Sequence, residues 1–235
     1  MTLWDHALVL AIAIGWPGYA LVTFQTYRQK VRSGVPGTRL AEYAESMLVQ
    51  WLFVALTIAL WIRMDRDFAA LSMVAPAGAA AWSGVAAAAL LGGFMVAQSA
   101  MVARRPDTHD QVRTALAPVA ELLPSDRNDL TGFLSLSITA GICEEILFRG
   151  LLPWYFAHVV GAWGGQGLAL VFFTGAHLYL GVTASVRAGL AGAIATGLCL
   201  WSSSLLPGML LHAALDVAAG WMGYEVLRER TPAAA

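Results

Sequence analysis

Charged side chains are scarce in this sequence. Only 12% of its 235 residues are Asp, Glu, Lys or Arg, which is about half the share that is usual in soluble domains. Hydrophobic residues make up 58%, and residues 68–103 and 150–186 contain none of these four charged types. A helix that crosses a bilayer needs roughly 20 consecutive apolar residues, and both stretches are longer than that. The composition therefore excludes an ordinary soluble protein and predicts a membrane protein with several spans.

The sequence also lacks a charge excess and a cysteine framework. Its formal net charge is −1, so we expect no nucleic-acid partner. The two cysteines, Cys143 and Cys199, lie in apolar sequence and are expected to be free thiols that pack as small hydrophobic side chains. Nine tryptophans are typical of a protein whose partner is the lipid bilayer, because indole rings favour the bilayer interface.

Several signatures of hydrolases and transporters are missing. The sequence contains neither the His-Glu-x-x-His helix of zinc peptidases nor the Gly-x-Ser-x-Gly turn of serine hydrolases. Internal repeats, which many transporters carry, are not evident either. Any chemistry must therefore come from a different set of side chains.

Apolar runs separated by polar turns predict an all-α transmembrane bundle of about seven membrane segments, some of them short or kinked. Residues 1–127 are expected to hold three spans and, at 104–129, an amphipathic interfacial or linker helix. Residues 128–227 are expected to form a core that carries the chemistry. In that core, Pro153 and the glycines of 161–165 should interrupt the helices.

Lys and Arg residues predict how the chain is oriented in the membrane. Four lie in the loop at 28–39, two at 63–76 and four at 104–129. Short cytoplasmic loops are enriched in Lys and Arg, so this alternation predicts an N-terminus outside the cytoplasm. It also places the Arg149 end of the fourth span outside.

Charged and imidazole side chains recur inside the apolar core, where an Asp or Arg at a helix centre costs about 2.5 to 3.5 kcal/mol. They form three groups, which are Glu144, Glu145 and Arg149; His177; and His212 with Asp216. Glu145 and Arg149 are four residues apart, so they share a helix face and can form an ion pair. Glu144 is rotated by about 100° and is left as the free carboxylate.

Each group alone is also typical of polar side chains that merely satisfy one another or hold helices together. Together, on three helices, they predict one shared polar site. A carboxylate beside an imidazole can deprotonate a water molecule, and a second imidazole with its neighbour can stabilise an oxyanion. This combination predicts hydrolysis of an amide bond.

In this order the three groups resemble the motifs of the CAAX protease and bacteriocin-processing family (CPBP, also Abi) of intramembrane peptidases. Those motifs are Glu-Glu-x-x-x-Arg, Phe-x-x-x-His and His-x-x-x-Asn/Asp, and here they begin at Glu144, Phe173 and His212. The resemblance covers about residues 130–224. It implies that Glu144 and His177 activate the water and that His212 and Asp216 form the oxyanion side. Glu145 and Arg149 would hold the helix in place.

The resemblance also implies a glutamate-type peptidase that requires no cofactor, although the family was long labelled metalloprotease. Asp216 stands where family members often have Asn. Because an ionised carboxylate repels an oxyanion, Asp216 would have to be protonated, orient His212 or help to bind a cation. A zinc site made by Glu144, His177 and His212 stays open as an alternative, since zinc takes such ligands.

We therefore expect an endopeptidase of membrane-associated protein or peptide substrates, in the plasma (inner) membrane of a prokaryote. A non-catalytic scaffold or immunity-type protein that retains the fold is an alternative. Another is a small transporter that uses Glu144 and Asp216 as a proton relay. CAAX-processing members resemble enzymes whose site opens to the cytosol, which conflicts with the orientation predicted above.

Overall fold

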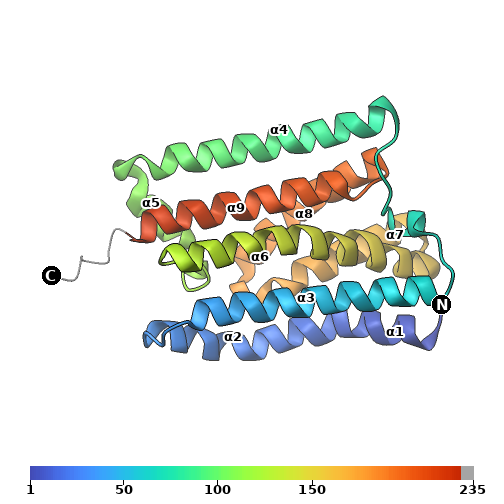
Figure 1. Ribbon diagram of the computed structural model, residues 1–235, viewed down its shortest axis with the longest axis horizontal. Coiled ribbons are helices and arrows are strands. Elements are labelled where there is room, and N and C mark those ends of the chain that lie inside the picture. The colour runs from blue at the N-terminus through green and yellow to red at the C-terminus, as the bar shows by residue number, and fades with distance from the viewer. Residues whose placement is uncertain (229–235) are drawn as a thin grey trace.

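The computed structural model describes residues 1–228, and every regular element in this range is a helix (Figure 1). Five stretches are long and apolar enough to cross a membrane, by length and composition, namely Leu3–Arg32, Thr38–Arg63, Gly78–Ala103, Arg127–Leu180 and Val182–Ser202. Helices are the expected form for such sequences, because they satisfy the backbone polar groups without water. The all-α prediction is confirmed.

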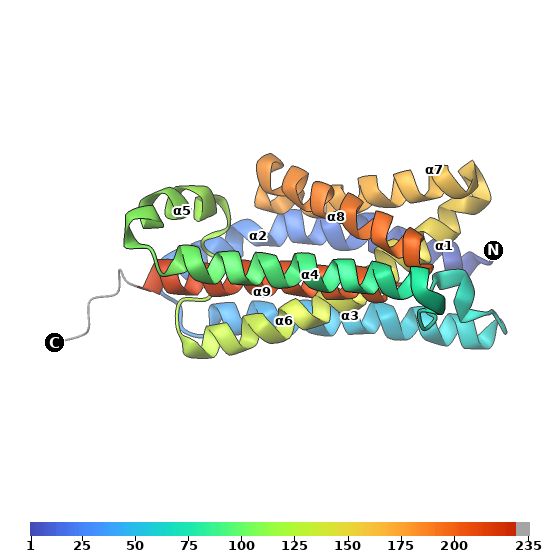
Figure 2. The ribbon, with the colours of Figure 1, turned by 90° about the horizontal axis from the view of Figure 1, so that it is seen from above.

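Seven rods make up the bundle within the described residues. They are α1 (Leu3–Leu10) joined to α2 (Trp16–Arg32), α3 (Thr38–Arg63), α4 (Gly78–Ala103), α6 (Arg127–Glu145), α7 (Leu152–Ala176), α8 (Val182–Ser202) and α9 (Leu206–Arg228). The helix α9 packs against α4, α6 and α8, and α3 packs against α6 (Figures 1 and 2). The first three rods and the later four thus form one bundle, in which α9 and α6 are central.

The interruptions expected in the core are present. The helix α6 passes into a π-helical turn at Ile146–Leu151, and Pro153 lies in the first turn of α7. At Gly161 the backbone of α7 adopts a φ of 76°, which glycine tolerates at little cost. A Cβ on Gly165 would lie 2.7 Å from the carbonyl oxygen of Pro153, so the two halves of α7 fold back on one another.

The polar stretch after α4 differs in part from the expected helix. It forms α5 (His109–Leu116) and a 3-10 turn at Ala117–Val119, where Pro118 removes a helix donor. Leu116 and Val119 pack against a buried cluster of Tyr43, Leu123 and Phe133. The segment therefore packs onto the end of the bundle as two short pieces.

Glu121 fixes this segment to α2 and α3. Its carboxylate lies 2.6 Å from Arg32 and 3.4 Å from Arg28, and its carbonyl oxygen accepts hydrogen bonds from the Tyr27 hydroxyl and from Arg39. Burial is the largest single influence on Glu121 and opposes its ionisation, but the hydrogen bond from Arg32, a backbone hydrogen bond and the charges of Arg28 and Arg32 together lower the pKa of this carboxyl. We call this Arg-rich end, with the loops 28–39 and 104–129, the basic end.

The opposite end of the bundle is closed by the loop 64–77. Arg66 donates two hydrogen bonds to the buried Asp5, at 2.7 and 2.8 Å, and stacks over Trp61 and Trp154. Leu71 of this loop is fully buried, and the Ser72 carbonyl oxygen accepts from the Leu205 amide. The loop thereby covers the core between the π-helical turn and the start of α9.

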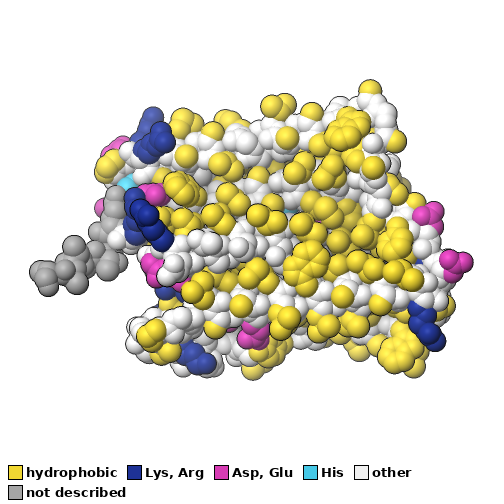
Figure 3. All heavy atoms as spheres, in the orientation of Figure 1, with side chains coloured by type: hydrophobic (Ala, Val, Ile, Leu, Met, Phe, Trp, Pro, Cys, Tyr) yellow, Lys and Arg dark blue, Asp and Glu magenta, His cyan; other side chains and the backbone are white. Residues whose placement is uncertain are grey.

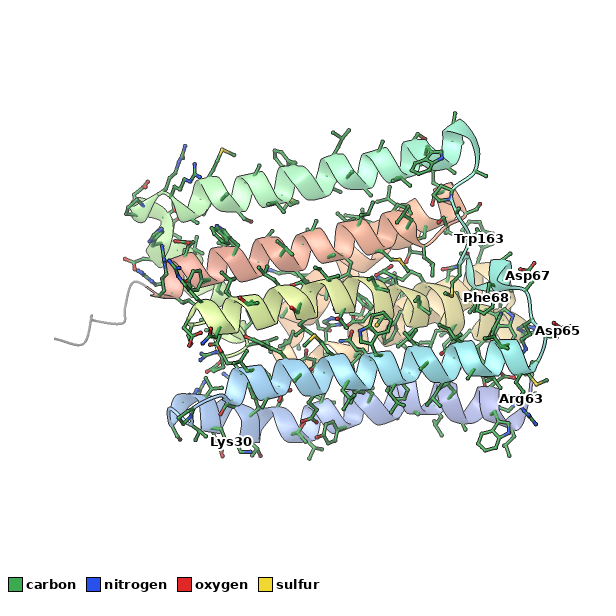
Figure 4. All side chains as sticks on the ribbon, viewed as in Figure 1. Lys30, Arg63, Asp65, Asp67, Phe68 and Trp163 are labelled. Carbon is green, nitrogen blue, oxygen red and sulfur yellow. The ribbon has the colours of Figure 1, made fainter. Side chains whose placement is uncertain are left out.

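The surface has the pattern of a membrane protein. Most charged side chains gather toward the two ends, and apolar side chains cover the length between them (Figure 3). Lys30 marks the basic end, while Arg63, Asp65 and Asp67 mark the closed end, where Trp163 is also exposed (Figure 4). Trp4, Trp82 and Trp201, which lie near helix ends on the same side, are exposed as well. Such a group of indoles is typical of a bilayer interface.

Candidate active site

Three helices bring the predicted site residues together. Glu144 and Glu145 end α6, His177 follows the last residue of α7, and His212 and Asp216 lie one turn apart on α9. The approach of α6 to α9 depends on Gly141, where a Cβ would lie 2.8 Å from the Cβ of Ala213. Small residues allow helices to come this close inside a membrane.

Glu145 is the hub of the buried polar contacts. Its side chain is fully buried, and Oε1 lies 3.0 Å from a guanidinium nitrogen of Arg149. This pair was predicted from the spacing and is confirmed. The same oxygen lies 2.8 Å from Nδ1 of His212, a contact that the spacing did not predict. Because a carboxylate accepts hydrogen bonds, Nδ1 of His212 carries the proton and Nε2 is the nitrogen left for other partners.

Phe173 supports two of the motif residues at once. Its ring lies under the Arg149 guanidinium, with 3.9 Å from Cζ to the ring centroid. Its carbonyl oxygen lies 2.8 Å from Nδ1 of His177, so that this nitrogen carries the proton. Nε2 of His177 is therefore an acceptor, as a general base requires.

Glu144 faces away from the Glu145–Arg149 pair, as the spacing predicted. Its Oε1 accepts a hydrogen bond of 3.3 Å from Nε2 of Gln50 on α3. Gln50 was not among the predicted site residues. Its signal in the sequence is a single amide in the apolar segment 46–62, but nothing in the spacing indicates which helix it contacts.

A cavity of about 210 Å³ contains most of the predicted site. Glu144, His177, His212 and Asp216 line it, together with Gln50 and Tyr179. From these residues it extends between α2, α3 and α6 to Glu42 and Leu122. Tyr179 was also missed by the sequence analysis, because it lies in the short turn after α7 and belongs to no motif.

A second cavity, of about 520 Å³, lies on the other side of the site. It is lined by α8, α9 and the α5 segment, and it reaches Arg149 and Arg187. His177, His212 and Asp216 line both cavities. These three residues therefore stand where the two cavities meet.

Asp216 is the least constrained of the predicted residues. Its Oδ2 lies 3.7 Å from Nε2 of His212, and its side chain is 39% exposed. This separation is too long for a hydrogen bond. Of the roles left open for Asp216, orienting His212 is thus performed by Glu145 in this structure.

The zinc alternative requires three ligands that converge on one point. Within residues 1–228, no group of three or more His, Cys, Asp or Glu side chains could hold a metal ion. Glu144, His177 and His212 share a cavity but do not form a ligand set as they are placed here.

Comparison with known proteins bears on the same residues. Residues 126–218 match a protein family described as type II CAAX prenyl endopeptidase Rce1-like. The resemblance to the CAAX protease family is confirmed. The match begins at Asp126, which caps α6, and includes all three motifs of the CAAX-protease core. No curated protein and no solved structure matches the chain.

The five apolar helical stretches and the family match together support an integral membrane protein in which residues 126–218 resemble a core of the CAAX-protease type. The general activity of such a core is intramembrane endopeptidase activity. The matched segment does not include Gln50 or any other residue of α1 to α4.

Proposed function

We propose that this CAAX-protease-type protein is a glutamate-based intramembrane endopeptidase in which Glu144 is the general base. One observation carries the proposal. The Glu144 carboxylate and the acceptor Nε2 of His177 belong to side chains that line one cavity, whereas the neighbouring Glu145 is neutralised by Arg149. A carboxylate without a cationic partner, beside an imidazole, is suited to hold and deprotonate a water molecule.

The proposed reaction begins with a water molecule between Glu144 and His177. Glu144 takes a proton from it as the oxygen attacks the scissile carbonyl carbon. Nε2 of His212 is protonated and donates a hydrogen bond to the developing oxyanion, while Glu145 stabilises the resulting imidazolium through Nδ1. The tetrahedral intermediate collapses when the C–N bond breaks, and Glu144 returns its proton to the leaving amine.

Asp216 completes the oxyanion side in this proposal. Its side chain lines both cavities near His212, so it can face the same carbonyl oxygen. Since an ionised carboxylate would repel that oxygen, we propose that Asp216 is protonated when the oxyanion forms.

The proposed substrate is a peptide segment of a membrane-associated protein, for which a prenylated C-terminal segment is one candidate. We propose that the basic end faces the cytoplasm of a prokaryote, because Lys and Arg mark that side in short loops. The first cavity extends toward this end, to Leu122 and Glu42, while the loop 64–77 covers the other. In this arrangement the N-terminus lies outside the cytoplasm and the site is still reached from the cytosol, so the two expectations are compatible.

Cleavage by the purified protein in liposomes tests the proposal. One quenched fluorescent peptide would end in a farnesylated Cys followed by two aliphatic residues and Met, and its partner would lack the lipid. A mixture of peptides from a bacterial membrane proteome, analysed by mass spectrometry for new termini, covers other sequences. We expect Glu144→Gln to lower kcat by about 10²- to 10⁴-fold and the control Glu225→Gln, near the end of α9, to retain activity.

Three results would change the proposal. Full activity of Glu144→Gln would exclude Glu144 as the base. Loss of activity with a chelator, restored by zinc, would replace the water-activating carboxylate with a metal mechanism. Absence of cleavage of every peptide by the wild type would favour a non-catalytic scaffold.

A further inference from the structure

Gln50 has an oxygen without a partner in the wall of the first cavity. The residue is only 3% exposed, and its Nε2 donates to Glu144. Its Oε1 is buried and has no hydrogen-bond partner among the described residues. Leaving a buried acceptor unsatisfied costs about 1 to 3 kcal/mol. A hydrogen-bond donor from a bound molecule would remove this cost.

Electrostatics fixes which way the amide points. An amide oxygen turned toward the Glu144 carboxylate would be repelled, whereas the NH₂ group is attracted and donates to it. Oε1 therefore points away from Glu144. Gln50 lines the cavity, so a peptide that enters the cavity lies against the side chain that carries this oxygen.

One face of α3 continues from Gln50 to the basic end. Glu42, Ser46 and Gln50 are spaced by four residues and all line the cavity, as do Glu45 and Val49. From Thr38, where α3 begins, to Gln50 the helix rises about 18 Å. A peptide that enters along this face would meet Gln50 immediately before Glu144.

A peptide in such a cavity brings its own donors. Each main-chain N–H that leaves water needs an acceptor, and more strictly so inside a membrane. Gln50 Oε1 is a buried acceptor of the matching kind, held beside the proposed general base.

We propose that Gln50 is a substrate-binding residue whose Oε1 accepts a hydrogen bond from a main-chain N–H of the substrate near the scissile bond. Its Nε2 holds Glu144 at the same time, so that one amide joins the substrate main chain to the base. This inference rests on the proposed function and deepens it. It lies outside the family match, which begins at residue 126.

The experiment combines Gln50→Met with substrate N-methylation. The probe is the peptide, of those tested above, that the wild type cleaves, made as a series in which one amide nitrogen at a time is methylated. In the wild type, methylation at one position should lower kcat/KM by about tenfold, the equivalent of one hydrogen bond of about 1.4 kcal/mol. Gln50→Met should lower kcat/KM for the unmodified peptide at least as much, and methylation at that same position should then have no further effect.

Thr57→Val is the matched control, because Thr57 is fully buried on the same helix and its hydroxyl donates to the Phe53 carbonyl oxygen four residues earlier. It should keep the wild-type response to every methylated peptide. Size-exclusion profiles and melting temperatures in detergent show whether each variant is folded. If Gln50→Met does not fold, Gln50→Asn replaces it, and its shorter amide should weaken the response at the same position.

The outcomes separate the two proposals. Suppose that the wild type cleaves in a Glu144-dependent way but Gln50→Met has the same kcat/KM as the wild type. The role of Gln50 is then overturned and the proposed function stands. The same conclusion follows if the decrease in kcat/KM from Gln50→Met multiplies with the decrease from methylation at every position of the peptide. If the wild type cleaves no peptide, both are overturned.

Discussion

Glu145 shows how a single buried carboxylate serves stability and geometry together. It forms the ion pair with Arg149 and also holds Nδ1 of His212. A buried charge is tolerated because its partners replace the lost water, and removing one partner leaves an uncompensated charge. When Glu145 and Arg149 are substituted together, protein stability and catalytic activity should therefore change in different ways.

We expect Arg149→Met to lower stability by about 3 kcal/mol, seen as a lower melting temperature in detergent. Adding Glu145→Gln to Arg149→Met removes the unpaired charge and should recover part of that loss. Activity should not recover, because the anion that orients His212 and favours its protonated form is gone. A double variant as unstable as Arg149→Met would contradict the coupling between the two residues.

Asp216 gives a second prediction at this scale. Because Asp216 lies 3.7 Å from Nε2 of His212 and does not orient it, Asp216→Asn should keep kcat/KM within about tenfold of the wild type. An amide can donate to the oxyanion, whereas Asp216→Ala cannot and should lose about 10²-fold or more. Equal losses in the Asn and Ala variants, measured on the same peptide, would show that the carboxylate itself is required.

The residues of the site were predictable to the extent that a single helix defines their spacing. The ion pair of Glu145 and Arg149 is predicted by their four-residue spacing, which places both side chains on one helix face. The same helical geometry predicts that Glu144 points away from that face. The contacts from Gln50 to Glu144 and from His212 to Glu145 join different helices. They depend on how those helices are aligned, which local spacing does not contain.

At the scale of elements, glycines set the distances between helices. Gly141 lies against Ala213. A Cβ added to Gly141 would lie 2.8 Å from the Cβ of Ala213 and 2.9 Å from the backbone nitrogen of Ala213. The backbone cannot yield as a flexible side chain can, so any Cβ at this position must move α6 away from α9. The site residues at the end of α6 would then separate from His212.

We therefore expect Gly141→Ala to lower both the melting temperature and kcat. Gly93→Ala on α4 is the control, since a Cβ there meets nothing within 4 Å, and alanine stabilises a helix interior by about 0.5 to 1 kcal/mol relative to glycine. It should leave activity unchanged and stability equal or slightly higher. Equal behaviour of the two variants would mean that α6 and α9 tolerate a wider separation.

Elements were predictable where glycine, proline and apolar runs define them. The interruptions at Pro153 and Gly161 follow directly from those residue types. The helix expected within 104–129 ended earlier, because Pro118 lies in the middle of its apolar pattern and removes a backbone donor. Pro118 is visible in the sequence, but the prediction of a continuous helix rested on the helical spacing of the apolar residues around it.

At the scale of the whole molecule, the two ends differ in charge and in tryptophan. The loops 28–39 and 104–129 lie at the basic end, and four exposed tryptophans lie on the opposite side. The positive-inside rule then predicts an orientation with the basic end in the cytoplasm. Native Cys143 and Cys199 are buried, so single introduced thiols can report on each side.

We expect Ala70→Cys to react with a membrane-impermeant maleimide in intact bacterial spheroplasts. Ser33→Cys, in the loop between α2 and α3, should react only after the membrane is permeabilised. Both native residues are exposed and small, so the changes should not disturb folding. Labelling in the reverse order would place the basic end outside, and the site would then be reached from that side.

The meeting of two cavities at His177, His212 and Asp216 has a consequence for turnover. A peptide held across this junction would be cut into one fragment in each chamber. Neither fragment would have to pass the other to leave, so the two products would depart with independent rates. Added in excess, each fragment would compete for its own half of the site alone, and the two together would inhibit more strongly than either one.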